Sequence, residues 1–381
     1  MTNKLFYGDN LDVLRRKIES GSVDLCYIDP PFNSKRNYFQ IYNNQGSEDR
    51  AQAQAFVDTW NWGDEAVEGL SYILDIERLS PRIGETVWTE QTVELIRGLE
   101  KVLRRGSLLA YLVHMTLRIV EIHRVLKPTG SFYLHCDPTA SHYLKLVLDA
   151  VFCGQGGDFL NEIIWKRTTS HSGSHRWAPV HDNLFLYSKS SEFTWNKTVE
   201  EYSKTYIEKH YRFKDKRGRF QVDNLTGSGV RGGDSGKPWR GVNPTTRSRH
   251  WAVPGAFLER FGFSEALEGL SVQQKLDLLD SKGFVYWPPK GEMPRLKRYF
   301  DKDAGVPIRS VINDIAPLSA QAAERLGYET QKPEALLERI IKASSNEGDT
   351  VLDAYCGCGT TVAVAQRLNR QWIGIDITLS P

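Results

Sequence analysis

Short apolar runs alternate with amphipathic segments at both ends of this chain, and the alternation is interrupted in the middle. Predicted strands occupy residues 5–7, 23–28, 131–135, 161–165, 183–187, 351–353 and 372–375. Predicted helices occupy residues 107–126, 142–151, 333–343 and 360–368. Such alternation is typical of a mainly parallel sheet covered by helices. We therefore expect one α/β sheet that is formed by both ends of the chain.

The middle of the chain is polar and basic. Between Lys166 and His250 there are 17 Lys and Arg against 8 Asp and Glu, although the net charge of the whole chain is only +2. Positive charge concentrated in one segment indicates a face for a polyanion, and a solvated, charge-rich insertion is the alternative. We predict three parts, which are residues 1–165, an insertion at 166–300, and residues 301–381.

Composition excludes several other classes of protein. The 381 residues are 40% hydrophobic and 25% charged, which is typical of a globular chain rather than a disordered one. No apolar run approaches the ~18 residues of a membrane-spanning helix, and the first residues lack the apolar core of a signal peptide. Five cysteines are few and odd in number, which favours a reducing cytoplasm over a disulfide framework. No metal site is predicted, because no His, Cys, Asp and Glu cluster has a suitable spacing.

A glycine turn lies between the predicted strand at 351–353 and the predicted helix at 360–368. Its sequence from Val351 is VLDAYCGCGTT, and Asp376 ends the next predicted strand. Glycines let a ligand approach the backbone, and a carboxylate at the end of the next strand accepts hydrogen bonds from ribose hydroxyls. The spacing predicts a nucleoside-binding crevice, for either a nicotinamide cofactor or S-adenosylmethionine. An ordinary strand-to-helix turn is the alternative.

The tetrapeptide Asp29-Pro30-Pro31-Phe32 directly follows the predicted strand at 23–28. Its two prolines stiffen the turn and have no backbone N–H, so the carbonyls and the Asp29 carboxylate form a rigid set of acceptors beside an aromatic ring. Such a set suits a planar group that carries an NH2, such as the exocyclic amine of adenine or cytosine, or a side-chain amide. A simple turn at the end of a strand is the alternative.

Together, these two motifs resemble those of the amino-methylating DNA methyltransferases that use S-adenosylmethionine. The tetrapeptide is similar to their catalytic Asp-Pro-Pro-Tyr/Phe motif, and residues 353–361 are similar to their Asp-Pro-Phe-x-Gly-Ser-Gly-Thr-Thr cofactor loop. Gln331-Lys332-Pro333-Glu334 resembles the Lys-Pro helix start of this family, and Gly8-Asp9-Asn10 resembles its Gly-Asp turn. Because the catalytic motif precedes the cofactor motif, the resemblance is to the β-group, which includes stand-alone and type III-like modification enzymes.

This resemblance implies a Rossmann-like methyltransferase fold with a mixed, circularly permuted, seven-stranded sheet and an inserted target-recognition region. It also implies that the strand at 372–375 lies beside the strand at 5–7. The implied catalytic residues are Asp29, Pro30, Pro31 and Phe32. The residues implied to bind S-adenosylmethionine are Asp9, Asn10, Asp29, Lys332, Pro333, Asp353, Tyr355, Cys356, Gly357, Gly359, Thr360, Thr361 and Asp376.

The implied reaction is methyl transfer to the exocyclic N6 of adenine in double-stranded DNA, on a base flipped out of the duplex. An Asp as first motif residue is typical of the adenine enzymes of this family and a Ser of the cytosine-N4 enzymes, so Asp29 favours adenine over cytosine. A Pro-Cys dipeptide, which cytosine-C5 methylation needs, does not occur. Methylation of an RNA base or a protein amide, and a recognition subunit of a larger restriction–modification complex, are the other hypotheses.

The basic insertion is the predicted DNA-binding region. Its candidate contacts to phosphates and bases are Lys166, Arg167, Arg176, Arg217, Arg219, Arg231, Arg240 and Arg249. Its aromatic residues either fill the gap left by a flipped base or pack the core of the insertion itself, and they are Trp177, Tyr211, Phe213, Trp239 and Trp251. The resemblance further implies a homodimer, a cognate restriction endonuclease as a possible partner, and a place in the bacterial cytoplasm with the nucleoid.

Overall fold

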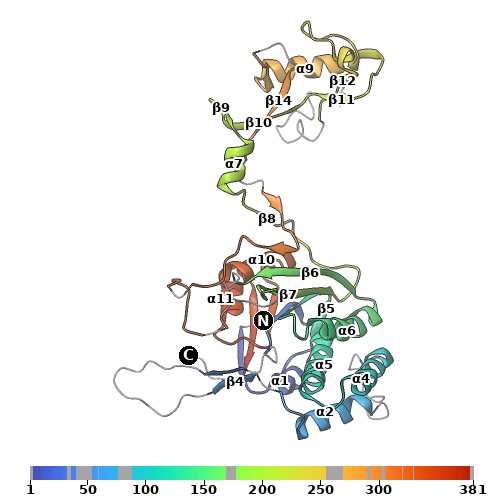
Figure 1. Ribbon diagram of the computed structural model, residues 1–381, viewed down its shortest axis with the longest axis vertical. Coiled ribbons are helices and arrows are strands. Elements are labelled where there is room, and N and C mark those ends of the chain that lie inside the picture. The colour runs from blue at the N-terminus through green and yellow to red at the C-terminus, as the bar shows by residue number, and fades with distance from the viewer. Residues whose placement is uncertain are drawn as a thin grey trace. The chain divides into compact units, whose positions relative to one another are not determined.

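A computed structural model describes residues 3–31, 36–39, 54–58, 60–75, 88–168, 177–254, 269–289, 293–301, 305–319, 321–328 and 330–377. The chain divides into two compact units, which we call the first unit (residues 1–198 and 308–381) and the second unit (residues 199–307). Each is described by itself (Figure 1). The second unit begins later than residue 166, because strand β7 (His181–Ser188) belongs to the sheet of the first unit. Among the described residues, no helix is long and apolar enough to cross a membrane.

The first unit is built on an eight-stranded sheet. In spatial order its strands are β1 (Lys4–Tyr7), β18 (Gln371–Asp376), β17 (Thr350–Asp353), β2 (Val23–Ile28), β5 (Leu126–Cys136), β7, β6 (Asp158–Lys166) and β16 (Val311–Ile312). Strand β7 is antiparallel to both neighbours, and the other neighbouring pairs are parallel. The mixed α/β sheet is confirmed. The expected number of seven strands is wrong, because β16 has only two residues and is too short to produce an apolar pattern.

Segments from the two ends of the sequence meet in this sheet. Strand β1 pairs in parallel with β18, with Leu5 opposite Gly374 and Phe6 opposite Ile375. Strand β17 joins this pair to β2, with Val351 opposite Leu25. The expectation that the strand at 372–375 lies beside the strand at 5–7 is therefore confirmed. The motifs that follow β1, β2, β17 and β18 consequently lie along one edge of the sheet, where the carboxyl ends of these parallel strands meet.

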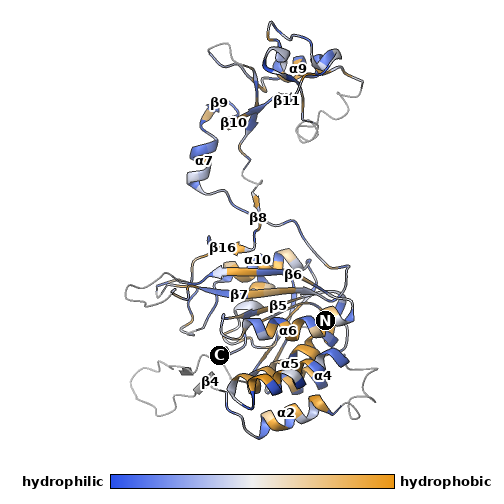
Figure 2. Ribbon diagram, turned by 45° about the vertical axis from the view of Figure 1, so that its right-hand side comes forward, coloured by the Kyte–Doolittle hydropathy of each residue, from blue (hydrophilic) through white to orange (hydrophobic). Residues whose placement is uncertain are grey.

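Helices cover both faces of the sheet. The core on one face contains α1 (Asn10–Lys17), α5 (Ser107–Val125) and α6 (Ser141–Phe152), and α2 (Asp64–Leu74) and α4 (Glu90–Leu103) pack against these helices. The other face packs against α10 (Glu334–Ser344) and α11 (Thr360–Arg367). Along β2, Cys26 and Ile28 enter the first core, whereas Leu25 and Tyr27 enter the second. Successive strand side chains point to opposite faces, so burial on both sides explains the apolar run of this strand. Figure 2 shows apolar residues concentrated in these strands and helices.

The remaining elements of the first unit are short. The 3-10 helix η2 (Cys153–Gln155) follows α6, and strands β3 (Arg36–Phe39) and β4 (Gln54–Asp58) form an antiparallel pair.

The second unit is a small mixed structure. Strands β8 (Val199–Glu200) and β15 (Val306–Pro307) pair at its two chain ends. Its four-stranded antiparallel sheet has the order β13 (Val285–Tyr286), β14 (Arg295–Tyr299), β10 (Gly218–Asn224) and β9 (Phe213–Asp215). Strands β11 (Thr226–Ser228) and β12 (Arg249–Trp251) form a separate pair. The helices are α7 (Lys204–His210), η3 (Gly233–Ser235), η4 (Pro244–Arg247) and α9 (Val272–Ser281).

A hydrophobic core of its own stabilises the second unit. Trp239 and Trp251 are buried in it against the apolar side of α9, so core packing is confirmed for these two aromatic residues. Tyr211 is also buried, and Phe213 stacks on Phe220 with a ring-centroid distance of 5.5 Å. By contrast, the Trp177 side chain is 98% exposed and belongs to the first unit. Most of the aromatic residues of the basic segment therefore have a packing role.

Candidate active site

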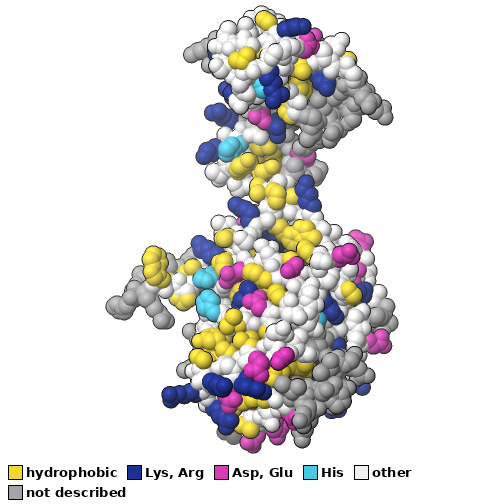
Figure 3. Space-filling view, turned by 90° about the vertical axis from the view of Figure 1, so that its right-hand side faces the viewer, with side chains coloured by type: hydrophobic (Ala, Val, Ile, Leu, Met, Phe, Trp, Pro, Cys, Tyr) yellow, Lys and Arg dark blue, Asp and Glu magenta, His cyan; other side chains and the backbone are white. Residues whose placement is uncertain are grey.

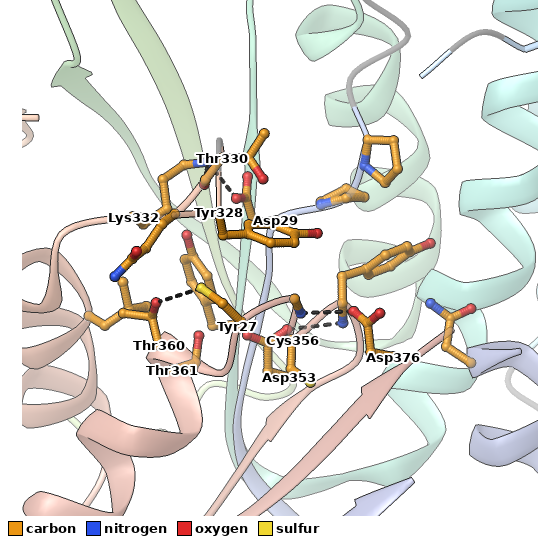
Figure 4. Close-up of a pocket in the computed structure, with 18 of the residues that line it drawn as sticks. Tyr27, Asp29, Tyr328, Thr330, Lys332, Asp353, Cys356, Thr360, Thr361 and Asp376 are labelled. Carbon is orange, nitrogen blue, oxygen red and sulfur yellow. Dashed lines mark hydrogen bonds and ion pairs between the residues drawn. The ribbon is translucent and has the colours of Figure 1, made fainter. Parts of the chain in front are cut away.

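A cavity of about 700 Å³ lies at the carboxyl edge of the main sheet. Ligand sites of open α/β sheets occur at this edge, because loops from several strand ends converge there. Figure 4 shows labelled side chains from β2, β17, β18 and the segment before α10 around this space. The predicted residues that line it are Asp9, Asn10, Asp29, Pro30, Pro31, Lys332, Asp353, Tyr355, Cys356, Gly357, Thr360, Thr361 and Asp376. Phe32 lies outside the described residues, whereas Pro333 and Gly359 are next to lining residues.

The glycine turn is bound to the strand beside it. The Gly357 N–H donates to Oδ2 of Asp376 at 2.8 Å, and the Cys356 N–H donates to the Ile375 carbonyl at 3.1 Å. Gly357 has a φ of 51°, and a Cβ there would lie 3.2 Å from the Tyr328 ring. Gly359 has a φ of 86° and is the N-cap of α11. A side chain at either glycine would be strained, so this turn requires both of them.

Asp353 is a buried carboxylate at the cavity. It ends β17 and accepts the Tyr355 N–H at 3.0 Å. Burial, together with the nearby negative charges of Asp29 and Asp376, raises the pKa of Asp353 to about 7, although hydrogen bonds from Thr361 and from the Tyr355 N–H act in the opposite direction. Asp29, Asp353 and Asp376 are three of the five aspartates among the described residues that line this cavity, and the mutual repulsion of nearby carboxylates favours either a bound proton or a cationic ligand.

Asp29 has one paired and one unpaired carboxylate oxygen. Its Oδ2 forms an ion pair with Nζ of Lys332, on the segment that leads into α10. Its Oδ1 is buried and has no hydrogen-bond partner among the described residues. Buried polar atoms are normally paired, so an unpaired acceptor in a cavity indicates a ligand atom that donates a hydrogen bond there. Asp29 is therefore placed to accept from an N–H or O–H group.

Asp9 and Asn10 are held in place by an arginine that sequence reasoning missed. Arg118 of α5 donates to Oδ2 of Asp9 at 2.7 Å and to Oδ1 of Asn10 at 2.5 Å. Asn10 also donates to the Ala354 carbonyl at 2.8 Å, and Asp9 caps α1. These contacts connect the turn after β1 with the turn after β17.

A second missed residue, His114, lies one turn before Arg118 on the same helix. Its ring is 4.3 Å from the Trp60 ring between centroids, and its Nε2 is 3.2 Å from the Tyr355 hydroxyl. Burial, assisted by the charge of Arg118, lowers the pKa of His114 to about 4, so its ring is neutral near pH 7. The signal for both residues is an imidazole and a cation within the mostly apolar run from Leu108 to Val120 of this helix.

A cluster of hydrogen-bonded polar residues lies at the cavity near the ends of β2, β6 and β7. His135 is fully buried, with Nδ1 at 2.9 Å from the Tyr27 hydroxyl and Nε2 at 3.2 Å from Oδ2 of Asp182. Arg167, predicted as a DNA contact, forms an ion pair with Asp182 at 3.0 Å. Tyr27, Asp182 and Arg167 all line the cavity. Arg167 therefore belongs to the cavity wall.

The other predicted DNA contacts fall into two classes. Arg217 donates to the Lys282 carbonyl, Arg240 pairs with Asp280, and Arg249 donates to Thr226, so these three stabilise the second unit. Lys166, Arg219 and Arg231 are exposed, and their side chains form no ion pair with described residues. Arg176 lies outside the described residues.

The sequence matches a protein-family model and is similar to curated modification enzymes. A family model described as DNA methylase, of the N6 and N4 type, matches residues 23–380. The type II methyltransferase M.EcaI of Enterobacter cloacae is 30% identical over 271 residues, which are 71% of this chain and 55% of that protein. The Mod subunit of the type III restriction-modification enzyme StyLTI of Salmonella typhimurium is 26% identical over 383 residues, covering 97% of this chain and 50% of that protein.

Among solved structures, the cytosine-N4-specific PvuII DNA methyltransferase is similar with a TM-score of 0.43 and 12% identity, covering 99% of this chain and 83% of that one. The chain spans about half the length of the two curated relatives described above.

Proposed function

This chain belongs to the N6/N4 DNA methylase family, and from this premise we propose that it methylates the N6 of adenine in double-stranded DNA. The methyl donor is S-adenosylmethionine. The observation that carries the proposal is the unpaired Oδ1 of Asp29, a buried acceptor in the cavity at the sheet edge. An exocyclic amine of a flipped base donates the hydrogen bond that this atom lacks.

The residues of the cavity fit S-adenosylmethionine by charge and by size. Asp29, Asp353 and Asp376 supply negative charge, and this cofactor carries a sulfonium and an ammonium group. The volume of about 700 Å³ lies within the range of roughly 300–1,000 Å³ that is usual for ligand pockets. In this proposal Asp376 holds the ribose, and Asp353 and the turn at 357–359 hold the methionine part. When bound, the cofactor supplies an electrophilic methyl group.

Asp29 then orients the amine that accepts the methyl group. Because Lys332 occupies Oδ2, Oδ1 is the oxygen that accepts an N–H of the target amine. This hydrogen bond turns the nitrogen lone pair away from conjugation with the ring and toward the methyl group. When bound, the cofactor would supply its methyl group to this nitrogen, and the proton that the nitrogen then loses would go to an acceptor such as Oδ1 of Asp29. The rate comes from positioning and from an acceptor placed in advance near the developing charge.

The proposal is tested by methyl transfer from labelled S-adenosylmethionine to a mixed DNA pool, followed by nucleoside analysis with mass spectrometry. We expect N6-methyladenine. The family includes both N6 and N4 methylases, so the N4 of cytosine is the second candidate target, although the Asp-first motif favours adenine. N4-methylcytosine in the digest would make cytosine the target base, with the same mechanism. Cofactor binding without label in DNA would instead favour RNA, protein or a missing subunit, and an RNA pool assayed in parallel separates the first of these.

The raised pKa of Asp353 predicts a pH-dependent affinity for the cofactor. In the ligand-free chain this carboxyl, with a pKa of about 7, is mostly protonated below neutral pH and must lose its proton to face a cationic ligand. We therefore expect the dissociation constant of the cofactor to fall as the pH rises toward 7, by up to about tenfold per pH unit, and to stay constant above pH 7. The measurement is titration calorimetry from pH 5.5 to 8.5.

The matched variant is Asp353→Asn, which keeps the size of the side chain and removes its titration. Ionisation of the cofactor itself affects both proteins equally, so it cancels in the ratio of the two dissociation constants. A constant ratio across this pH range would contradict a role for Asp353 in the pH dependence.

The relative described as a Mod subunit supports a second proposal on assembly, in which the chain works beside a restriction subunit. A homodimer is also part of the proposal. Gel filtration with light scattering on the purified chain, alone and with duplex DNA, gives the mass of each form.

A further inference from the structure

The hairpin formed by β9 and β10 concentrates positive charge in the second unit. Residues 212–219 have the sequence RFKDKRGR, with five cations and a single acidic residue. The whole second unit has 20 Lys and Arg against 14 Asp and Glu, and the rest of the chain has an excess of acidic residues. The positive charge of the unit is therefore concentrated in one short element.

The register of the hairpin places its charges on one face. Phe213 is opposite Phe220, and these rings pack with Tyr286 and Tyr299 on one side of the sheet. Lys214 is opposite Arg219, so both side chains point to the other side, where they are exposed. One face of the hairpin is thus aromatic and packed, and the other is cationic.

Packing within the unit does not explain this cationic face. Like charges directly opposite one another destabilise a strand pair. The side chains of Lys214, Lys216 and Arg219 form no ion pair or hydrogen bond with the residues that the structure describes. Lys297, on the packed face, differs because its ammonium pairs with Asp215 at 2.9 Å. These exposed cations, which have no partner among the described residues, are therefore available to an anion from outside the unit.

We propose that the exposed face of the β9–β10 hairpin, with Lys214, Lys216 and Arg219, is a DNA-binding surface that contacts the phosphates of a duplex. The inference rests on the proposed function and extends it to a particular element. Lys and Arg side chains on this face can neutralise DNA phosphates, which releases condensed counterions. Figure 3 shows Lys and Arg side chains spread over the visible face of this unit with few acidic ones among them.

Salt-dependent DNA binding of the full chain tests this inference. A fluorescent duplex is titrated with wild-type protein and with the double variant Lys214→Gln/Arg219→Gln, from about 50 to 200 mM salt. We expect the variant to bind about tenfold more weakly at the low end. We also expect the slope of log K against log salt to become shallower by about 1.8, since each lost phosphate contact removes about 0.9. Because two like charges no longer face each other, the melting temperature should not fall.

The control is Lys275→Gln/Lys282→Gln, which removes the same charge from α9 and from the residue after it. We expect this control to keep most of the wild-type slope, and Lys214→Arg/Arg219→Lys to keep both slope and affinity. Equal slopes for wild type and hairpin variant, or an equal loss in the α9 control, would overturn the inference. A wild-type chain that binds cofactor but no duplex would instead overturn the proposed function. If the hairpin variant bound duplex DNA like the wild type but bound RNA more weakly, the surface would be an RNA-binding surface instead.

Discussion

Replacing Asp29 by Ala is expected to lower methyl transfer by about 10²- to 10³-fold, while the cofactor still binds within a few-fold of the wild-type affinity. The reason is that Oδ1 of Asp29 is a buried cavity acceptor without a hydrogen-bond partner among the described residues, and that in the proposed function it binds the target amine. The measurement is single-turnover transfer of labelled methyl groups, with cofactor binding followed by calorimetry. The effect should appear in the chemical step and not in the affinity for DNA.

Two further variants separate the roles of this carboxylate. Asp29→Asn keeps a carbonyl oxygen that accepts a hydrogen bond and loses the charge, so its activity should lie between those of wild type and Asp29→Ala. Asp158→Asn removes an exposed carboxylate at the start of β6 and should leave transfer unchanged. Transfer within about threefold of wild type in folded Asp29→Ala would place the chemistry elsewhere.

The sheet edge and its motifs could be predicted because their signals are local. An apolar run ends at Ile28 and the Asp-Pro-Pro sequence follows it, and another run ends at Asp353 before the glycine turn. Parallel strands bring such turns together once the chain alternates strands and helices, so the cavity follows from the order of the elements. The two-residue strand β16 has no such pattern and was therefore missed.

Contacts between distant residues could not be predicted in the same way. Lys332 and Asp29 are separated by 303 positions and Arg118 and Asn10 by 108, and no periodicity relates them. The partners of the charged side chains in the basic segment could not be predicted either, because a count of charges does not show which way each side chain points. Arg217 and Arg219 are two residues apart, yet the first donates to the Lys282 carbonyl and the second is exposed beside Lys214.

The ion pair between Lys332 and Asp29 leads to the second large expected effect. The family resemblance implies that Lys332 binds the cofactor, whereas its contact with Asp29 supports a positioning role on the carboxylate that we propose to be catalytic. Lys332→Met should lower turnover at saturating cofactor and DNA by about 10- to 100-fold, the range of a hydrogen bond to a charged group. Without the ammonium group, the carboxylate turns more freely and Oδ1 is no longer kept available for the amine.

Turnover and cofactor affinity together distinguish the two roles of Lys332. Lys332→Arg keeps a cation within reach of Oδ2 and should recover part of the turnover, which a loss caused only by poor packing would not predict. In Lys332→Met, a positioning role lowers turnover and changes the cofactor dissociation constant by less than about threefold. A dissociation constant raised tenfold or more with unchanged turnover at saturation would return Lys332 to the cofactor. Asp29 would then keep its orientation through the rigid turn of Pro30 and Pro31 alone.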